Sequence, residues 1–432
     1  MAWKDTEKDK MRHQLRMTIG ATTRVSQILS LAPYPLTLFQ GDHCDVNSDR
    51  NQVVIFFRHL FAIFITGATV ASQFVLFFFY PDLLYQPTAP AFIKILYYIV
   101  NVLQSLTVAN LMIGCERRRL QYEGYFSEVL QLIRATIEQS DCEETIWYRN
   151  TAKALLIAYS TVTVLLPFII ATVHMGIGTI PYAIAQVVPF TISYLILAQY
   201  YCVYVHLSSI ARKLNKRLTK LVSINSPLEQ GEQRKGKSIA YDFVTRSVST
   251  VKEIHISSDQ IDQLRLLHVQ TIEITNSLCI NFGLVIILIV VAAFASINIE
   301  LLEMYQSIRH PTLTPLTIFM KFIFAMIKFS FFVLIAYPNR LIQNENQSTL
   351  FMLYKIRRSS YAPDVNGVIK NEKQMIRAIL FQIEHYISQI ANLQDVYQAC
   401  GMINLDMKLI SNVVAAITSI MVVLIQFADS SS

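Results

Sequence analysis

Long stretches with almost no charge recur along the chain, separated by polar segments. A stretch of about 20 apolar residues forms a helix long enough to cross the ~30 Å hydrocarbon core of a bilayer. Inside a bilayer such a stretch must be helical, because an isolated segment satisfies its own backbone hydrogen bonds only as a helix. The pattern therefore predicts an all-α membrane protein with seven transmembrane helices, at residues 60–80, 91–115, 154–175, 182–205, 277–297, 316–337 and 409–427.

The distribution of basic residues predicts the orientation. Of the 37 Lys and Arg residues, 33 fall in segments 1–59, 116–153, 206–276 and 338–408, and the loops between the other span ends hold only Arg309. Cytosolic loops of membrane proteins collect Lys and Arg. The N-terminus is therefore predicted in the cytosol and the C-terminus outside. The net charge of +7 has the same cause, so no nucleic-acid partner is predicted.

The basic segments also carry a helical pattern. Residues 123–139, 243–270 and 372–393 repeat apolar side chains at i, i+3 and i+4 spacing. We therefore expect long cytosolic helices that extend the membrane spans and pack on one another.

Several functional classes fit this pattern poorly. Seven spans suggest a G-protein-coupled receptor, but the predicted orientation is the reverse of that class. No DRY-like sequence closes span three, and no NPxxY-like sequence closes span seven. A transporter would be expected to show buried carboxylates, and no Asp or Glu lies in the middle of a predicted span. The chain has no HExxH, GxSxG or Walker sequence, so no enzyme is predicted. The six cysteines show no CxxC pairing, and no metal or cofactor is predicted.

The last span carries the most specific motif. It reads Ser419-Ile420, five apolar residues, then Gln426-Phe427, and the run Ala399–Gly401 precedes it. This resembles the TY-x5-QF signature that closes the last helix of insect gustatory receptors. Two positions depart from that signature, since Ser419 stands for Thr and Ile420 for Tyr, while the Gln-Phe end is intact.

The resemblance implies a ligand-gated, non-selective cation channel in the plasma membrane of sensory neurons. It implies a homotetramer, or a heteromer with related receptors, around one central pore, with a small-molecule tastant and the lipid bilayer as partners. The chain then divides into a cytosolic N-terminal segment (1–59), spans one to six with their extensions (60–337), cytosolic anchor helices (338–408), and a pore helix with an extracellular tail (409–432). Gating by a hydrophobic ring of Phe427 would work by dewetting. The predicted pore and gate residues are Ala416, Ile420, Val423, Gln426 and Phe427.

The resemblance also implies a ligand pocket in the outer half of spans two to six. Tyr, Asn and Gln side chains at that depth offer flat apolar area with hydrogen-bonding groups, although polar residues also join membrane helices to one another. The predicted pocket residues are Tyr97, Tyr98, Asn101, Gln104, Thr172, His174, Tyr182, Gln186, Phe190, Tyr194, Thr317, Phe319 and Lys321.

Two further features bear on the ligand. A charge inside the membrane is costly, so Lys328, deep in span six, needs a partner that the sequence does not identify, whereas Lys321 lies near the outer end and is expected to reach the interface. Both tryptophans, Trp3 and Trp147, are predicted to be cytosolic. A pocket without Trp is less suited to stacking on sugars, which favours a bitter or deterrent plant compound, with a sugar second.

Overall fold

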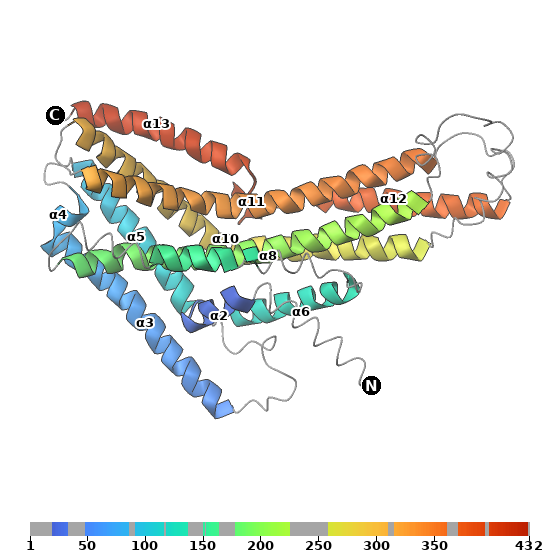
Figure 1. Cartoon of the computed structure of the whole chain (residues 1–432), viewed down its shortest axis with the longest axis horizontal. Helices are drawn as coiled ribbons and strands as arrows, with labels where there is room; N and C mark the ends of the chain where they lie inside the picture. The colour runs from blue at the N-terminus through green and yellow to red at the C-terminus, as the bar shows by residue number, and fades with distance from the viewer. Residues whose placement is uncertain are drawn as a thin grey trace.

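A computed structural model of the chain is almost entirely helical (Figure 1). It describes residues 20–32, 48–85, 91–115, 118–136, 150–151, 153–163, 178–224, 258–309, 315–360, 370–393 and 397–430. The helices are α2 (Gly20–Ile28), α3 (Ser48–Phe79), α4 (Pro81–Leu84), α5 (Ala91–Ile113), α6 (Arg119–Thr136), α8 (Thr179–Ile224), α10 (Ser258–Arg309), α11 (Pro315–Ser360), α12 (Lys370–Leu393) and α13 (Lys408–Ser430).

Six of the described helices are long and apolar enough to cross a membrane: α3, α5, α8, α10, α11 and α13. They correspond to predicted spans one, two, four, five, six and seven. The third predicted span, 154–175, is described only as far as residue 163, and that part is helical. The count of seven and the orientation of the termini therefore stay predictions.

The three longest helices form the body of the molecule. Helices α8, α10 and α11 contain 46, 52 and 46 residues, or roughly 69 to 78 Å at 1.5 Å per residue, about twice the hydrocarbon thickness of a bilayer. Each has an apolar half (179–205, 277–309 and 315–337) and a polar half. They run side by side, with α12 along their polar halves (Figure 1). The predicted extension of membrane spans into long helices is confirmed for these three.

Buried polar side chains hold the polar halves together. The Asn215 amide of α8 donates to the main-chain oxygen of Glu345 in α11 at 2.9 Å, and the Thr349 hydroxyl of α11 donates to the Asn215 side-chain oxygen. His268 of α10 contacts the Tyr386 hydroxyl of α12. A buried polar group left unpaired costs about 1–3 kcal/mol, so this network favours one register of the four helices.

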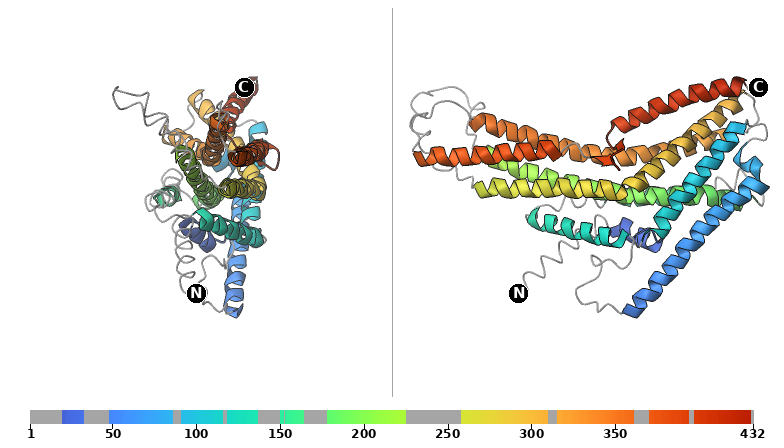
Figure 2. Two further views of the ribbon diagram at one scale, coloured as in Figure 1. Left: turned by 90° about the vertical axis from the view of Figure 1, so that its right-hand side faces the viewer. Right: turned by 180° about the vertical axis from the view of Figure 1, so that it is seen from behind.

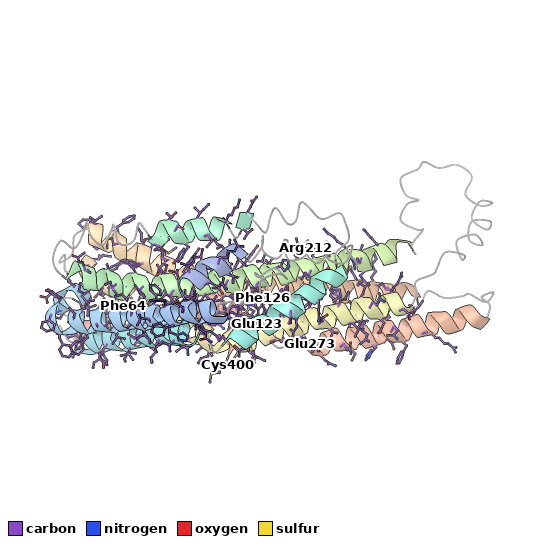
Figure 3. The ribbon with its side chains drawn as sticks, turned by 90° about the horizontal axis from the view of Figure 1, so that it is seen from below. Phe64, Glu123, Phe126, Arg212, Glu273 and Cys400 are labelled. Atoms are coloured by element: carbon purple, nitrogen blue, oxygen red, sulfur yellow. The ribbon has the colours of Figure 1, made fainter. Side chains whose placement is uncertain are left out.

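The remaining helices lie against the apolar half. Helices α3 and α5 pass at a slant to the long helices, and α2 and α6 lie beside the middle of the molecule (Figure 2). On α3, large side chains such as Phe64 (67% exposed) and Phe78 (60% exposed) point away from the bundle. Figure 3 shows Phe64 in the apolar part, and Arg212 and Glu273 on the polar halves. The outward phenylalanines are the surface expected of a helix in contact with lipid.

A short hairpin joins α12 to α13. Strands β1 (Gln398–Ala399) and β2 (Ile403–Asn404) pair in antiparallel fashion. Positive φ angles at Cys400 (50°) and Gly401 (69°) form the turn, a combination typical of type I′ turns. Gly283 of α10 lets the hairpin approach, because a Cβ there would lie 2.9 Å from the Cys400 nitrogen. The hairpin, and with it the start of α13, therefore lies against the middle of α10.

Two predicted boundaries are wrong. Helix α3 begins at Ser48, well before residue 60. Helix α10 continues to Arg309, whereas the sequence pattern placed the end of this span at residue 297 and a loop at 298–315. The extension brings Glu300 and Glu303, 9% and 2% exposed, into the apolar half. The sequence analysis had assigned these two glutamates to a loop; their pairing with lysines, described below, is what makes their burial tolerable.

Candidate ligand pocket and pore helix

Two adjoining cavities lie between the apolar halves of α5, α8, α10 and α11. About 390 and 430 Å³ of space not filled by atoms lies within them, part of it open to solvent. Gln104, Gln186 and Ser296 belong to both walls, so the two cavities form one pocket. The remaining lining residues are Tyr97, Val100, Asn101, Thr107, Tyr182, Pro189, Phe190, Ser193, Ile289, Ala292, Ala293, Ile299, Glu300, Lys321, Phe324, Lys328 and Phe331.

Helical periodicity brings the polar residues to this pocket. Residues at i, i+4 and i+7 or i+8 lie on one face of a helix. Each of the four helices places such a stripe on the pocket wall. The stripes are Tyr97, Asn101 and Gln104 on α5; Tyr182, Gln186 and Phe190 on α8; Ser296 and Glu300 on α10, with Glu303 one turn beyond the lining; and Lys321 and Lys328 on α11.

Two ion pairs cross from α10 to α11 at the pocket. Lys328 contacts Glu300 and the Ser296 hydroxyl, with side chains 9% and 11% exposed in the ion pair. Lys321 contacts Glu303, and their side chains are 18% and 3% exposed. Two lysines and two glutamates leave the site with no formal net charge. This compensation is what makes four ionised groups tolerable inside an apolar bundle.

The ion pairs supply the partner that Lys328 needed and correct the expectation for Lys321. Lys321 does not extend to the interface; it turns inward to Glu303, which also accepts a hydrogen bond from the Tyr97 hydroxyl. The helix boundary at Ile297 hid both glutamates from the sequence analysis. The spacing of Ser296, Glu300 and Glu303, together with two lysines lacking partners, was the signal that could have revealed them.

Two buried acceptor atoms in the pocket have no partner among the described residues. These are the Gln104 Oε1 atom and the Glu300 Oε2 atom. A buried acceptor without a hydrogen bond is destabilising, and such atoms in native proteins call for an explanation. A bound molecule with N–H or O–H groups would satisfy both.

The structure brings together seven of the thirteen predicted pocket residues. They are Tyr97, Asn101, Gln104, Tyr182, Gln186, Phe190 and Lys321. Tyr194 lies beside them, with its ring 6.3 Å from Phe190 and stacked at 6.0 Å on Tyr159. Tyr98 and Phe319 instead face outward, 56% and 59% exposed, because they fall off the pocket stripes of their helices. Thr172, His174 and the Thr317 side chain lie outside what the structure describes.

Helix α13 is attached to the bundle along one narrow face. Leu409, Val413 and Ile417 are buried against the bundle. Only 17% of the most apolar window of α13 is buried, against 33–61% in the other five candidate spans. Figures 1 and 2 show the helix running from the hairpin back toward the end where α10 and α11 meet. A membrane helix so little covered by its own chain has most of its surface available to something else.

The predicted pore residues lie on the uncovered part of α13. Ile420 and Val423 are 38% and 47% exposed, Gln426 is exposed, and Ala416 is half-buried. The Phe427 side chain lies outside what the structure describes. Beside the apolar stripe of Ala416, Ile420 and Val423 runs a polar stripe at i, i+7 and i+14, formed by Asn412, Ser419 and Gln426, all exposed. The sequence analysis assigned Gln426 a role here but missed Asn412.

These features are those of a helical protein in which six of the described helices are long and apolar enough to cross a membrane, with a pocket between four of them. The family model for the 7tm chemosensory receptors matches residues 19–431, and the chain belongs to that family.

Two known proteins are similar to the chain. A Drosophila melanogaster protein described as "Putative gustatory receptor 59f" is 26% identical over 172 residues, which are 39% of this chain and 38% of that protein's length. The solved structure of the olfactory receptor OR5 from Machilis hrabei in complex with eugenol is similar in fold, with a TM-score of 0.54. That match covers 96% of this chain and 99% of the olfactory receptor, at 11% identity. It supports the fold of the whole chain.

Proposed function

We propose that this chain is a gustatory receptor, a tastant-gated, non-selective cation channel of the plasma membrane of sensory neurons. The single observation that carries the channel proposal is the uncovered α13, 17% buried in its most apolar window. In lipid, the exposed side chains of Asn412, Ser419 and Gln426 would be unfavourable. Around a water-filled pore shared by several copies of the chain they would be hydrated. The family membership and the Gln426-Phe427 end support the same reading.

Assembly as a tetramer, of one chain or with related receptors, fits the polar halves as well. Phe351 and Tyr354 of α11 and Phe381 of α12 are 71%, 50% and 69% exposed. These aromatic side chains lie where the helices are too polar to face lipid. Aromatic residues are enriched at protein interfaces. In our proposal, neighbouring subunits cover them, and α13 of each subunit lines the pore.

The pocket supports a small ligand with several hydrogen-bond donors. Gln104 Oε1 and Glu300 Oε2 are unpaired acceptors that N–H or O–H groups of a ligand could satisfy. Phe190 and Phe331, whose stacked rings have centroids 5.2 Å apart, provide an apolar wall. The olfactory receptor of similar fold was solved with the small molecule eugenol. A bitter or deterrent plant compound is the first candidate, because the described pocket has Tyr and Phe but no Trp, and a sugar is the second.

The channel proposal is tested by expressing the chain alone in cells and applying a tastant panel. We expect tastant-evoked cation currents in excised membrane patches, without any G-protein components. An epitope tag at the C-terminus should be stained on intact cells. Glu300→Gln should shift the concentration dependence of the response, whereas Tyr98→Phe, on the outward face of α5, should not.

Two other functions are separated by the same experiment. A G-protein-coupled receptor would give responses only with added G protein and would hide the C-terminal tag inside the cell. A non-channel membrane protein would bind ligand with no current. Either result would contradict the proposal.

A further inference from the structure

A second cavity lies between α2, α6, α8 and α10, away from the ligand pocket. It encloses about 490 Å³. Phe282 lies in its wall, and Ile289, the nearest α10 residue of the ligand pocket, is seven positions further along the helix, roughly 10 Å at 1.5 Å per residue. The two sites share none of their described lining residues, so the cavity is a separate site at the other end of the apolar half. Its lining residues are Thr23, Arg118, Gln121, Tyr122, Tyr125, Phe126, Gln199, Val203, Leu278, Asn281 and Phe282.

Most of the wall is aromatic and apolar. The Tyr122 ring lies 6.1 Å from the Phe282 ring and 6.2 Å from the Phe126 ring. The Tyr122 hydroxyl donates to the Gln199 side-chain oxygen at 3.1 Å, and the Gln199 amide in turn donates to Ser26 of α2. This chain of hydrogen bonds fixes the wall. An apolar molecule, or the apolar part of one, fits such a surface.

Two buried donor atoms of residues that line this cavity have no hydrogen-bond partner among the described residues. Tyr125 is 9% exposed, and its hydroxyl has no partner. Arg118 donates from Nη2 to the Leu111 main-chain oxygen at 2.7 Å, but its buried Nε atom has no partner. Burial raises the pKa of Tyr125 well above its ordinary value, so the hydroxyl stays protonated and able to donate. Arg118 is the one charged side chain among the described residues that line the cavity.

The cavity lies at the depth where the membrane surface is expected. Helix α5 ends at Ile113, and α8 and α10 change from apolar to polar sequence close to Val203 and Leu278. Arg118 is the middle residue of three consecutive arginines. Clusters of basic residues directly after a span attract anionic lipid head groups. Gln121 at the cavity is exposed, so the site opens to the surface.

We propose that this cavity binds a membrane lipid with an anionic head group. The Arg118 guanidinium and the Tyr125 hydroxyl hold the head-group oxygens, and the aromatic wall covers the start of an acyl chain. The bound lipid joins α6 to α8 and α10, so it stabilises the packing of these helices independently of tastant binding.

Native mass spectrometry of the purified full-length receptor tests this proposal, with phosphatidic acid and phosphatidylcholine of the same acyl chains as probes. We expect the receptor to retain phosphatidic acid in preference to phosphatidylcholine. Arg118→Gln and Tyr125→Phe should each weaken that retention by about tenfold, as expected when one charge-assisted hydrogen bond is lost. Tyr125→Phe removes only an unpaired hydroxyl, so folding should be unaffected. Arg340→Gln at an exposed position of α11 and Tyr98→Phe on the outward face of α5 are the matched controls.

Three results would overturn the proposal. Equal retention of the two lipids would remove the role of the anionic head group. Unchanged retention in both Arg118→Gln and Tyr125→Phe would place the lipid elsewhere. Displacement of phosphatidic acid by inorganic phosphate at equal concentration would show an anion site that does not use the apolar wall.

Discussion

Glu300 and Lys328 face each other across α10 and α11, with side chains 11% and 9% exposed. Neither side chain is expected to stay both buried and ionised without the other, since an isolated ionised group in a low-dielectric interior is strongly unfavourable. The lysine could be recognised from the sequence as a residue in need of a partner. The glutamate could not, because its partner lies 28 positions away and hydropathy placed the helix end before it.

The ion pair between Glu300 and Lys328 predicts how single and double substitutions change the free energy of unfolding. Lys328→Met leaves Glu300 buried without its cation, so the free energy of unfolding should fall by about 3–5 kcal/mol. The double change Glu300→Gln with Lys328→Met should recover most of that loss, since no unpaired charge remains. Thermal unfolding of the purified receptor, followed by fluorescence-detected gel filtration, measures both.

Lys94→Met is the matched control for this pair. Lys94 also lies in an apolar helix, but it contacts the Tyr85 ring at 5.4 Å, and its loss should cost about 1 kcal/mol or less. If Lys328→Met were no worse than Lys94→Met, the ion pair would not carry the stability assigned to it.

At the scale of elements, periodicity is a good guide to which segments are helical and a poor one to where they end. The six described spans were all predicted. Seven of the predicted pocket residues line the pocket, and they had been chosen for the depth at which the resemblance implies a pocket. The hairpin before α13 was not predicted. Its turn is formed by only two residues with positive φ, Cys400 and Gly401, and its packing depends on a contact with α10 that lies more than a hundred positions earlier in the chain.

That contact yields a prediction at Gly283. A methyl group there would lie 2.9 Å from the Cys400 nitrogen and from its Sγ atom, closer than atoms can approach, so Gly283→Ala should displace the hairpin and cost about 1–3 kcal/mol. Because the hairpin positions α13, the tastant concentration for half-maximal current should also change. Gly67→Ala is the control, since nothing lies within 4 Å of its added Cβ. Equal behaviour of the two variants would mean that the hairpin does not hold α13.

At the scale of the whole molecule, the decisive feature is how little of α13 its own chain covers. The sequence analysis placed Ala416, Ile420, Val423 and Phe427 on the pore face, from periodicity and a resemblance. A single chain leaves both that apolar stripe and the neighbouring polar stripe uncovered. In our proposal both stripes border the pore, and how much of each lines it depends on contacts between copies, so no pattern within one sequence decides it.

Cysteine substitution along α13 separates these two arrangements. Val423→Cys and Val422→Cys lie next to each other in sequence but about 100° apart around the helix, and both side chains are exposed, at 47% and 51%. We expect a charged thiol reagent, applied from outside during tastant-evoked current, to block Val423→Cys channels and to spare Val422→Cys channels. The parent chain is the background control, because its Cys400 lies at the hairpin near the other end of α13. Block of Val422→Cys alone would turn the lining face of α13 by about 100° and remove Ala416, Ile420 and Val423 from it. In the proposed tetramer, four copies of each lining residue surround the ions, so a single modified position is enough to reveal the lining face.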